Sequence, residues 1–327
     1  MAGGEQASPF GNEQSGGTLI PAAAWERDSA KRALDELFTL SHQYRSGKSY
    51  YELMQFVARF RFYSPFNAML VHVQMAGAKY VAPPHRWLCE FGRRIKAGAR
   101  PLVILQPMGP VMFVFDVSDT EPTENAESLP PEVDKPFEVR KGCVGNRLER
   151  VIENAKRDGV RITKSNEGSQ SAGSIRHVDK DVKVSQEFQT GVDEYRKPKF
   201  TDVPVRYDLL ISEKLSAESQ YVTIVHELAH LYCGHLGTPN DKWWPNRLGL
   251  NDVTQEFEAE SVAYLVCSRS NIDNPSEQYL SGYVEVEKEV DVPPISLECV
   301  MKAAGLIETM SQQRMKPREQ SKEEPGA

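Results

Sequence analysis

The stretch IVHELAHLYCGH, residues 224–235, places two histidines four residues apart with a glutamate directly after the first. On a helix, His226 and His230 leave the same face, where two imidazole nitrogens can reach one zinc ion. Glu227 then lies beside the first ligand and can act as a general base on a water molecule. The surrounding TIVHELAHLY contains no charge besides Glu227, no Pro and no Gly. We therefore expect a buried zinc helix. The competing interpretation is a core helix that happens to carry histidines.

A catalytic zinc site needs a third protein ligand and an open coordination position. One source is His235, just after an expected helix end at Gly234. The longer pattern H-E-x-x-H-x-x-G-x-x-H does not fit, because it requires glycine and histidine where the chain has Cys233 and Leu236.

The second source is the downstream stretch QEFEAESVAYLVC, residues 255–267. On a helix, Glu256 and Glu260 share a face, which suits Glu256 as the third ligand and Glu260 as a carboxylate that orients a ligating histidine. Glu258 is the competitor and lies about 160° further round the helix. The spacing favours Glu256.

HELAH (226–230) followed by EFEAESVA (256–263) resembles the ImmA/IrrE metallopeptidases and the related protease domain of the ArdC antirestriction proteins. The resemblance implies one zinc ion per chain, bound by His226, His230 and Glu256, with Glu227 as the base. It also implies that VRYDLLIS (205–212) is the edge strand along which such enzymes hold an extended substrate. The residue that stabilises the oxyanion is left open between His235 and a tyrosine such as Tyr264.

The N-terminal part of the chain is basic although the whole protein has a net charge of −7. Between Trp25 and Phe115 there are 13 Lys and Arg against 6 Asp and Glu. Arginines alternate there with aromatic residues, a composition that allows phosphate contacts and base stacking. The alternative is a purely structural role, in which the aromatic residues form a core and the arginines a solvated rim. The candidate nucleic-acid contacts are Arg59, Arg61, Arg93, Arg94, Lys96 and Arg100, and the candidate stacking rings are Tyr63, Trp87 and Phe91.

Three segments of this region also follow the order of the ArdC N-terminal domain. They are SPFNAMLVHVQ (64–74), FGRRIKAGARPLVILQP (91–107) and VMFVFDVSDTE (111–121). The resemblance implies binding of single-stranded DNA.

The five cysteines are scattered and form no C-x-x-C pair, which argues against a disulfide framework and favours a reducing cytoplasm. The chain has no apolar run long enough to cross a bilayer and no signal-peptide pattern at its start.

We expect an α+β protein of two domains, a small helical and hairpin N-terminal domain and a gluzincin-like zinc metallopeptidase domain. The expected segments are a disordered start at 1–19, a DNA-binding domain at 20–117, an acidic linker at 118–137, the metallopeptidase domain at 138–310 and a disordered tail at 311–327. The predicted function is a zinc-dependent endopeptidase that acts on a regulatory or DNA-associated protein. The alternative is a non-proteolytic, single-stranded-DNA-binding antirestriction protein with a structural zinc. The sequence identifies neither the protein substrate nor the oligomeric state.

Overall fold

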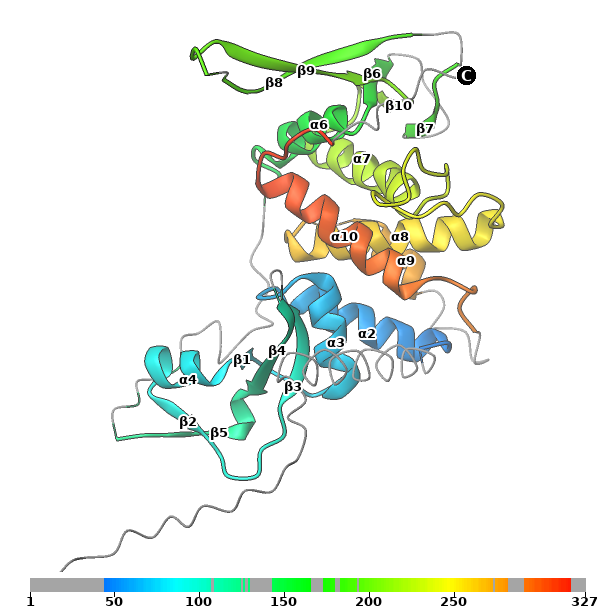
Figure 1. Ribbon diagram of the computed structural model, residues 1–327. Helices are drawn as coiled ribbons and strands as arrows, with labels where there is room; N and C mark the ends of the chain where they lie inside the picture. The colour runs from blue at the N-terminus through cyan, green and yellow to red at the C-terminus, as the bar shows by residue number, and fades with distance from the viewer. Residues whose placement is uncertain are drawn as a thin grey trace, which may run out of the picture.

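The protein has a mixed α+β fold with several small sheets (Figure 1). The computed structural model describes residues 44–106, 109–124, 126, 129, 143–165, 173–179, 183–192, 194–272, 274–281 and 291–318. The expected disordered start and most of the expected linker lie outside the described residues.

A group of packed helices forms the centre of the molecule. Helices α7 (Ala217–Tyr232), α8 (Asp252–Arg269) and α10 (Leu297–Gln312) contact one another, and α6 (Arg147–Arg157) packs on α10 and α7. Their apolar faces form a single hydrophobic core, and the apolar residues that α7 and α8 contribute to it are almost completely buried. The short helix α9 (Ser276–Ser281) packs against α8.

A three-stranded sheet covers one side of α7, in the order β6 (Val160–Ser165), β10 (Tyr207–Ser212) and β7 (Gly173–His177). β10 runs parallel to β6 and antiparallel to β7. The prediction that 205–212 is the edge strand is therefore wrong, because β10 pairs on both sides. The strand that borders the metal helix at the edge is β7, which sequence patterning did not separate from its polar surroundings.

A long two-stranded ribbon extends from this sheet (Figure 1). It consists of β8 (Ser185–Val192) and β9 (Pro198–Pro204), paired antiparallel with a bulge between Gln189 and Gly191. Phe188 and Val203 anchor its inner face, and the Arg157 guanidinium lies 5.2 Å from the centre of the Phe188 ring.

The N-terminal region begins with α2 (Gly47–Arg59) and α3 (Pro65–Gln74), which pack against each other. The side chains of Ser46 and Ser64 cap the two helices by accepting hydrogen bonds from backbone N–H groups. The predicted hairpin after these helices is present as β3 (Leu102–Gln106) and β4 (Gly109–Asp116), with β1 (Val81–Ala82) paired to β4.

A smaller hydrophobic cluster lies beside this hairpin. Helix α4 (Pro84–Phe91) contributes Trp87 and Phe91, and a second pair of strands, β2 (Arg93–Ile95) and β5 (Thr120–Pro122), closes the unit. The predicted linker therefore starts too early, because Thr120 is buried and belongs to β5, where it pairs with Ile95 of β2.

The N-terminal helices share the core of the metal-helix region. α2 packs on α8, and α3 packs on α10. Arg269, at the end of α8, donates hydrogen bonds to the carbonyl oxygens of Val57 and Phe60 at the end of α2, 2.8 and 3.0 Å away. The division into two domains stays a prediction, and along this contact the hydrophobic core is continuous.

The expected disordered tail also starts too early. Residues 311 and 312 belong to α10, and the chain beyond it returns to α6. The backbone N–H of Met315 donates to Asn154 at 2.9 Å, and Arg318 donates to the buried Asp158 at 3.0 Å. None of the described helices combines the length and hydrophobicity that crossing a bilayer requires.

Candidate metal centre

Helix α7 carries both histidines and the adjoining glutamate on consecutive turns. The hydroxyl of Ser216 caps its first turn by accepting a hydrogen bond from the N–H of Ser219. Apolar residues bury one face of the helix, so His226 and His230 emerge together on the partly open face. The four-residue spacing predicted this arrangement.

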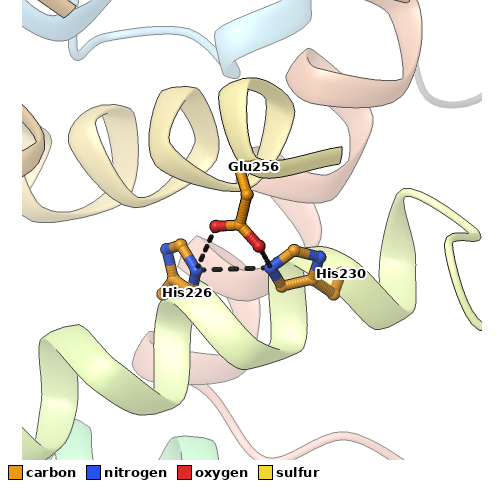
Figure 2. A group of neighbouring side chains, drawn as sticks. All are labelled: His226, His230 and Glu256. Carbon is orange, nitrogen blue, oxygen red and sulfur yellow. Dashed lines mark hydrogen bonds and ion pairs between the residues drawn. The ribbon is translucent and has the colours of Figure 1, made fainter. Parts of the chain in front are cut away.

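Helix α8 presents Glu256 to these histidines (Figure 2). Asn251 caps the helix by accepting a hydrogen bond from the N–H of Thr254, which places Glu256 in the first turn and a half. Ala259 and Ala263 follow on the same face and are fully buried, so no large side chain separates α8 from α7 at this level.

The three donor atoms lie at distances that suit one metal ion (Figure 2). The Nε2 atoms of His226 and His230 are 3.2 Å apart, and each lies 3.5 Å from a carboxylate oxygen of Glu256. Ligand atoms about 2.0–2.1 Å from a tetrahedral zinc ion are separated by roughly 3.3 Å. Two imidazoles and one carboxylate are also the donor types of a catalytic zinc site. The residues therefore fit a divalent metal ion.

The charges of the donors also suit a metal ion. The hydrogen bond to His226 lowers the pKa of Glu256, which keeps its carboxylate ionised. Burial lowers the pKa of His230 to about 4, so its ring is neutral near neutral pH. Burial alone would lower the pKa of His226, but the neighbouring carboxylates raise it overall. A metal ion at Nε2 of His226 would compete with a proton for that nitrogen.

Glu227 lies at the wall of the cavity in front of these donors. Burial raises the pKa of Glu227, as a general base requires, and the backbone N–H of Ile175 in β7 donates to the Glu227 carboxylate. Gly173, also in β7, packs closely here. A Cβ atom at that position would lie 2.5 Å from Cγ2 of Thr223 and 3.5 Å from Cγ of Glu227. The sheet edge thus fixes the position of the glutamate.

The cavity has a volume of about 650 Å³ and opens between α7, α8 and β7. The metal-donor candidates and Glu227 form its polar floor, and Gln255 lies beside Glu256 at one side. A second cavity of about 420 Å³ follows along the same strand, beyond the hydrogen bond between Nε2 of His177 and the carbonyl oxygen of Leu236.

The predicted supporting carboxylate Glu260 is near its expected partner. Its Oε1 atom lies 3.7 Å from Nδ1 of His226, the nitrogen that faces away from His230 and Glu256. This placement is compatible with orientation of the ring by an electrostatic contact.

Glu258 and His235, the alternative ligands considered from the sequence, do not contact the facing Nε2 atoms of His226 and His230, and His235 contacts the opposite nitrogen, Nδ1, of His230. Glu258 is fully buried and bonded to Arg247, His235 and the N–H of Ser296. Both ring nitrogens of His235 are engaged, one by Glu258 and one by His230. His235 therefore has no free nitrogen for an oxyanion, and Tyr264 is buried outside the lining of the cavity. Both suggestions for the oxyanion donor are wrong in this structure.

Sequence reasoning missed the partner of Glu258. Arg247 lies in the loop between α7 and α8, and its guanidinium binds both oxygens of the Glu258 carboxylate, at 2.6 and 2.7 Å. A glutamate on a largely apolar helix without a basic residue nearby in sequence was the available signal, since a buried carboxylate requires a cation or several donors.

The six basic residues proposed for nucleic-acid contacts fall into two groups. Arg61 donates to the carbonyl oxygen of Ser268 at 2.9 Å, and Arg93 donates to the side chain of Thr120 at 2.7 Å, so both bind other parts of the protein. The remaining four are exposed, namely Arg59, Arg94, Lys96 and Arg100. Of these, Arg94 pairs with Glu121 at 2.7 Å, and the Lys96 ammonium donates to the carbonyl oxygen of Ser118 at 2.7 Å.

The three candidate stacking rings serve the core. Trp87 and Phe91 are buried, and the Tyr63 hydroxyl donates to the carbonyl oxygen of Val81 at 3.1 Å. The stacking assignment is wrong for Trp87 and Phe91, whereas Tyr63 is partly buried against the core and its assignment stays a prediction. The rings that the surface offers in this region are Phe62, 45% exposed, and Phe113, 53% exposed.

The site has the donor set of an HExxH metallopeptidase, with two histidines of one helix and a glutamate of the next. Residues 179–267 match the model of the peptidase M78 family, described as the IrrE N-terminal-like domain. The match contains α7 and almost all of α8, and hence the three metal-donor candidates and Glu227.

Two solved structures are similar to this chain, both of the antirestriction protein ArdC from plasmid R388. The metal-free crystal structure is 12% identical in sequence, and the alignment covers 78% of this chain and 87% of the ArdC chain, with a TM-score of 0.33. The Mn(II)-bound crystal structure is also 12% identical, and the alignment covers 77% of this chain and 85% of the ArdC chain, with a TM-score of 0.34. No curated protein matches the chain. The comparisons return the two families that the sequence resembles.

Proposed function

We propose that this protein is a zinc-dependent endopeptidase of the ImmA/IrrE type. The observation that carries the proposal is the convergence of His226, His230 and Glu256 within 3.5 Å of one another, with Glu227 beside them. Zinc at these donors, one ion per chain, would supply Lewis-acid chemistry, by lowering the pKa of a water molecule and polarising the scissile carbonyl.

The protein's own residues would then move the protons. Glu227, raised in pKa by burial, accepts the proton of the attacking water and delivers it to the departing amine nitrogen. The N–H of Ile175 holds the Glu227 carboxylate in place through both steps.

The substrate we infer is a polypeptide in extended conformation. β7 is an edge strand of its sheet among the described residues, and it borders both cavities in turn. An extended peptide can add to such an edge through main-chain hydrogen bonds, with alternate side chains entering the cavities. We propose a regulatory or DNA-associated protein as the natural substrate, because a basic region accompanies the site.

The test is peptide cleavage by the zinc-loaded wild type and by Glu227→Gln, using a mixture of unstructured peptides. We expect the variant to lose cleavage while it retains one zinc per chain by mass spectrometry. Glu218→Gln, an exposed glutamate in the first turn of the same helix, is the matched control and should cleave normally. Equal cleavage by wild type and Glu227→Gln would reject the peptidase.

The alternative function is binding of single-stranded DNA, with the metal in a structural role. It is favoured by the exposed cations Arg94, Lys96 and Arg100 and by the exposed strand residue Phe113, all within the basic N-terminal region. Binding to an oligonucleotide should weaken steeply with salt and be reduced by changing these three cations to glutamine. Salt-sensitive binding without any peptide cleavage would favour this alternative.

A further inference from the structure

We propose that His235 is a positioning residue, which holds the proton of the His230 ring on Nδ1 and so leaves Nε2 free to bind the metal. The inference rests on the proposed metal site and extends it to a buried chain of side chains that runs from His230 through His235 to Glu258 and Arg247. Of these four side chains, only His230 and His235 line the cavity, and Glu258 and Arg247 lie behind them.

The end of helix α7 brings the two rings together. Gly234 adopts a positive φ of 82°, which ends the helix and turns the chain back, so that the N–H of His235 donates to the carbonyl oxygen of His230 at 3.0 Å. In this turn the Nδ1 atoms of the two rings face each other at 3.0 Å. A side chain at 234 would collide with the carbonyl oxygen of Pro245, 2.1 Å from the position of its Cβ.

Glu258 determines the positions of the protons. Both oxygens of its carboxylate accept from the Arg247 guanidinium, and one also accepts from the N–H of Ser296, so the carboxylate is placed to accept from Nε2 of His235, at 2.8 Å. A neutral histidine that donates from Nε2 accepts at Nδ1. His230 must therefore donate from Nδ1, and its Nε2 lone pair points at His226 and Glu256.

A second metal site at this position is ruled out by its charges. Cys233, His235 and Glu258 are all buried and close enough to share an ion. The Arg247 guanidinium, however, occupies both oxygens of Glu258 and donates to the carbonyl oxygen of Cys233 at 3.2 Å. A cation placed among these residues would be repelled by that buried positive charge. The cluster supports the metal centre and does not bind a second ion.

Two substitutions separate the two bonds of His235. Asparagine places its Oδ1 where histidine has Nδ1, so His235→Asn keeps an acceptor for His230 and loses the bond to Glu258. Glutamine places its Nε2 where histidine has Nε2, so His235→Gln keeps the donor to Glu258 and loses the acceptor. We expect near-normal zinc affinity for His235→Asn and affinity about 10–100-fold weaker for His235→Gln. Exposed His85→Gln is the control and should bind as the wild type does.

The second measurement needs neither metal nor substrate. Long-range proton–nitrogen NMR correlation of the metal-free wild type should show His230 protonated at Nδ1. His235→Asn should retain that tautomer, and His235→Gln should lose it. An Nε2-protonated His230 in the wild type, or equal zinc affinities of the two variants, would overturn the proposal. Because neither readout uses peptide cleavage, a protein with the expected tautomer but no peptidase activity would reject the proposed function alone.

Discussion

Glu256 and Glu258, two residues apart on α8, contact the two ends of one pair of imidazoles. Glu256 lies 3.5 Å from Nε2 of His230, and Glu258 lies 2.8 Å from Nε2 of His235, whose other nitrogen meets His230. The first carboxylate is half exposed at the cavity and the second is fully buried. Helix α8 thus supplies Glu256, a metal-donor candidate, and Glu258, which supports His230 through His235.

Removal of these two carboxylates should have different consequences. Glu256→Ala should lose most of its zinc on dialysis with little change in the stability of the metal-free protein, since the side chain is half exposed. Glu258→Ala should destabilise the metal-free protein by about 3 kcal/mol or more, because Arg247 stays buried without its partner. Zinc content by mass spectrometry and urea unfolding of the metal-free forms measure the two effects. Full zinc retention by Glu256→Ala would remove that residue from the ligand set.

Gly173→Ala should reduce peptide cleavage at least tenfold without loss of zinc. The added methyl group would lie 2.5 Å from Thr223 and would push β7 away from Glu227, so that the base loses its alignment. The measurement is kcat/KM on the best peptide substrate, with zinc content determined on the same sample. Gly191→Ala is the control, because nothing lies within 4 Å of its added Cβ.

His72 should make the protein less stable in mild acid. Burial lowers the pKa of His72 to about 4 from an ordinary value of 6.5, and its Nδ1 has no hydrogen-bond partner among the described residues. The unfolded chain therefore binds the proton more tightly than the folded one. Stability falls as the pH drops from about 6.5 to about 4, by up to about 3 kcal/mol.

His72→Phe should remove this part of the pH dependence, because phenylalanine fills the site without a titrating group. Urea unfolding at pH 7.5 and pH 4.5 measures the difference between the two proteins. The wild type should lose more stability than His72→Phe between these pH values. Equal losses would show that His72 does not control the acid sensitivity.

Arg269→Met should be strongly destabilising. The guanidinium is buried and bonds the carbonyl oxygens of Val57, Phe60 and Tyr63 as well as Glu308, all of which would lose a donor. We expect a loss of about 3 kcal/mol or more in the free energy of unfolding. Lys302→Met removes only an exposed pair with Glu298 and should cost less than about 1 kcal/mol.

Local spacing predicted the parts of the site that lie on one helix. The four-residue interval between His226 and His230 depends only on helix geometry, and the face shared by Glu256 and Glu260 follows from the same period. The hairpin at β3 and β4 was also predictable, because two apolar runs flank a short turn.

Contacts between distant segments could not be read from the sequence. The pairing of Arg247 with Glu258 depends on how the loop after α7 closes, and the edge position of β7 depends on which strands flank β10. The burial of Trp87 and Phe91 could not be predicted for the same reason. An aromatic residue beside arginines can lie in the core or on the surface, depending on which distant residues pack against it.

Helix α2 lies directly behind the helix that carries Glu256. The Tyr50 hydroxyl donates to Ser261 at 2.7 Å, and its ring packs against Phe257, so α2 covers residues on the buried side of α8. Without α2, helices α6 to α10 would expose this apolar face of α8 to solvent. The helix that carries Glu256 therefore needs the N-terminal helices, or an equivalent apolar cover, on its buried side.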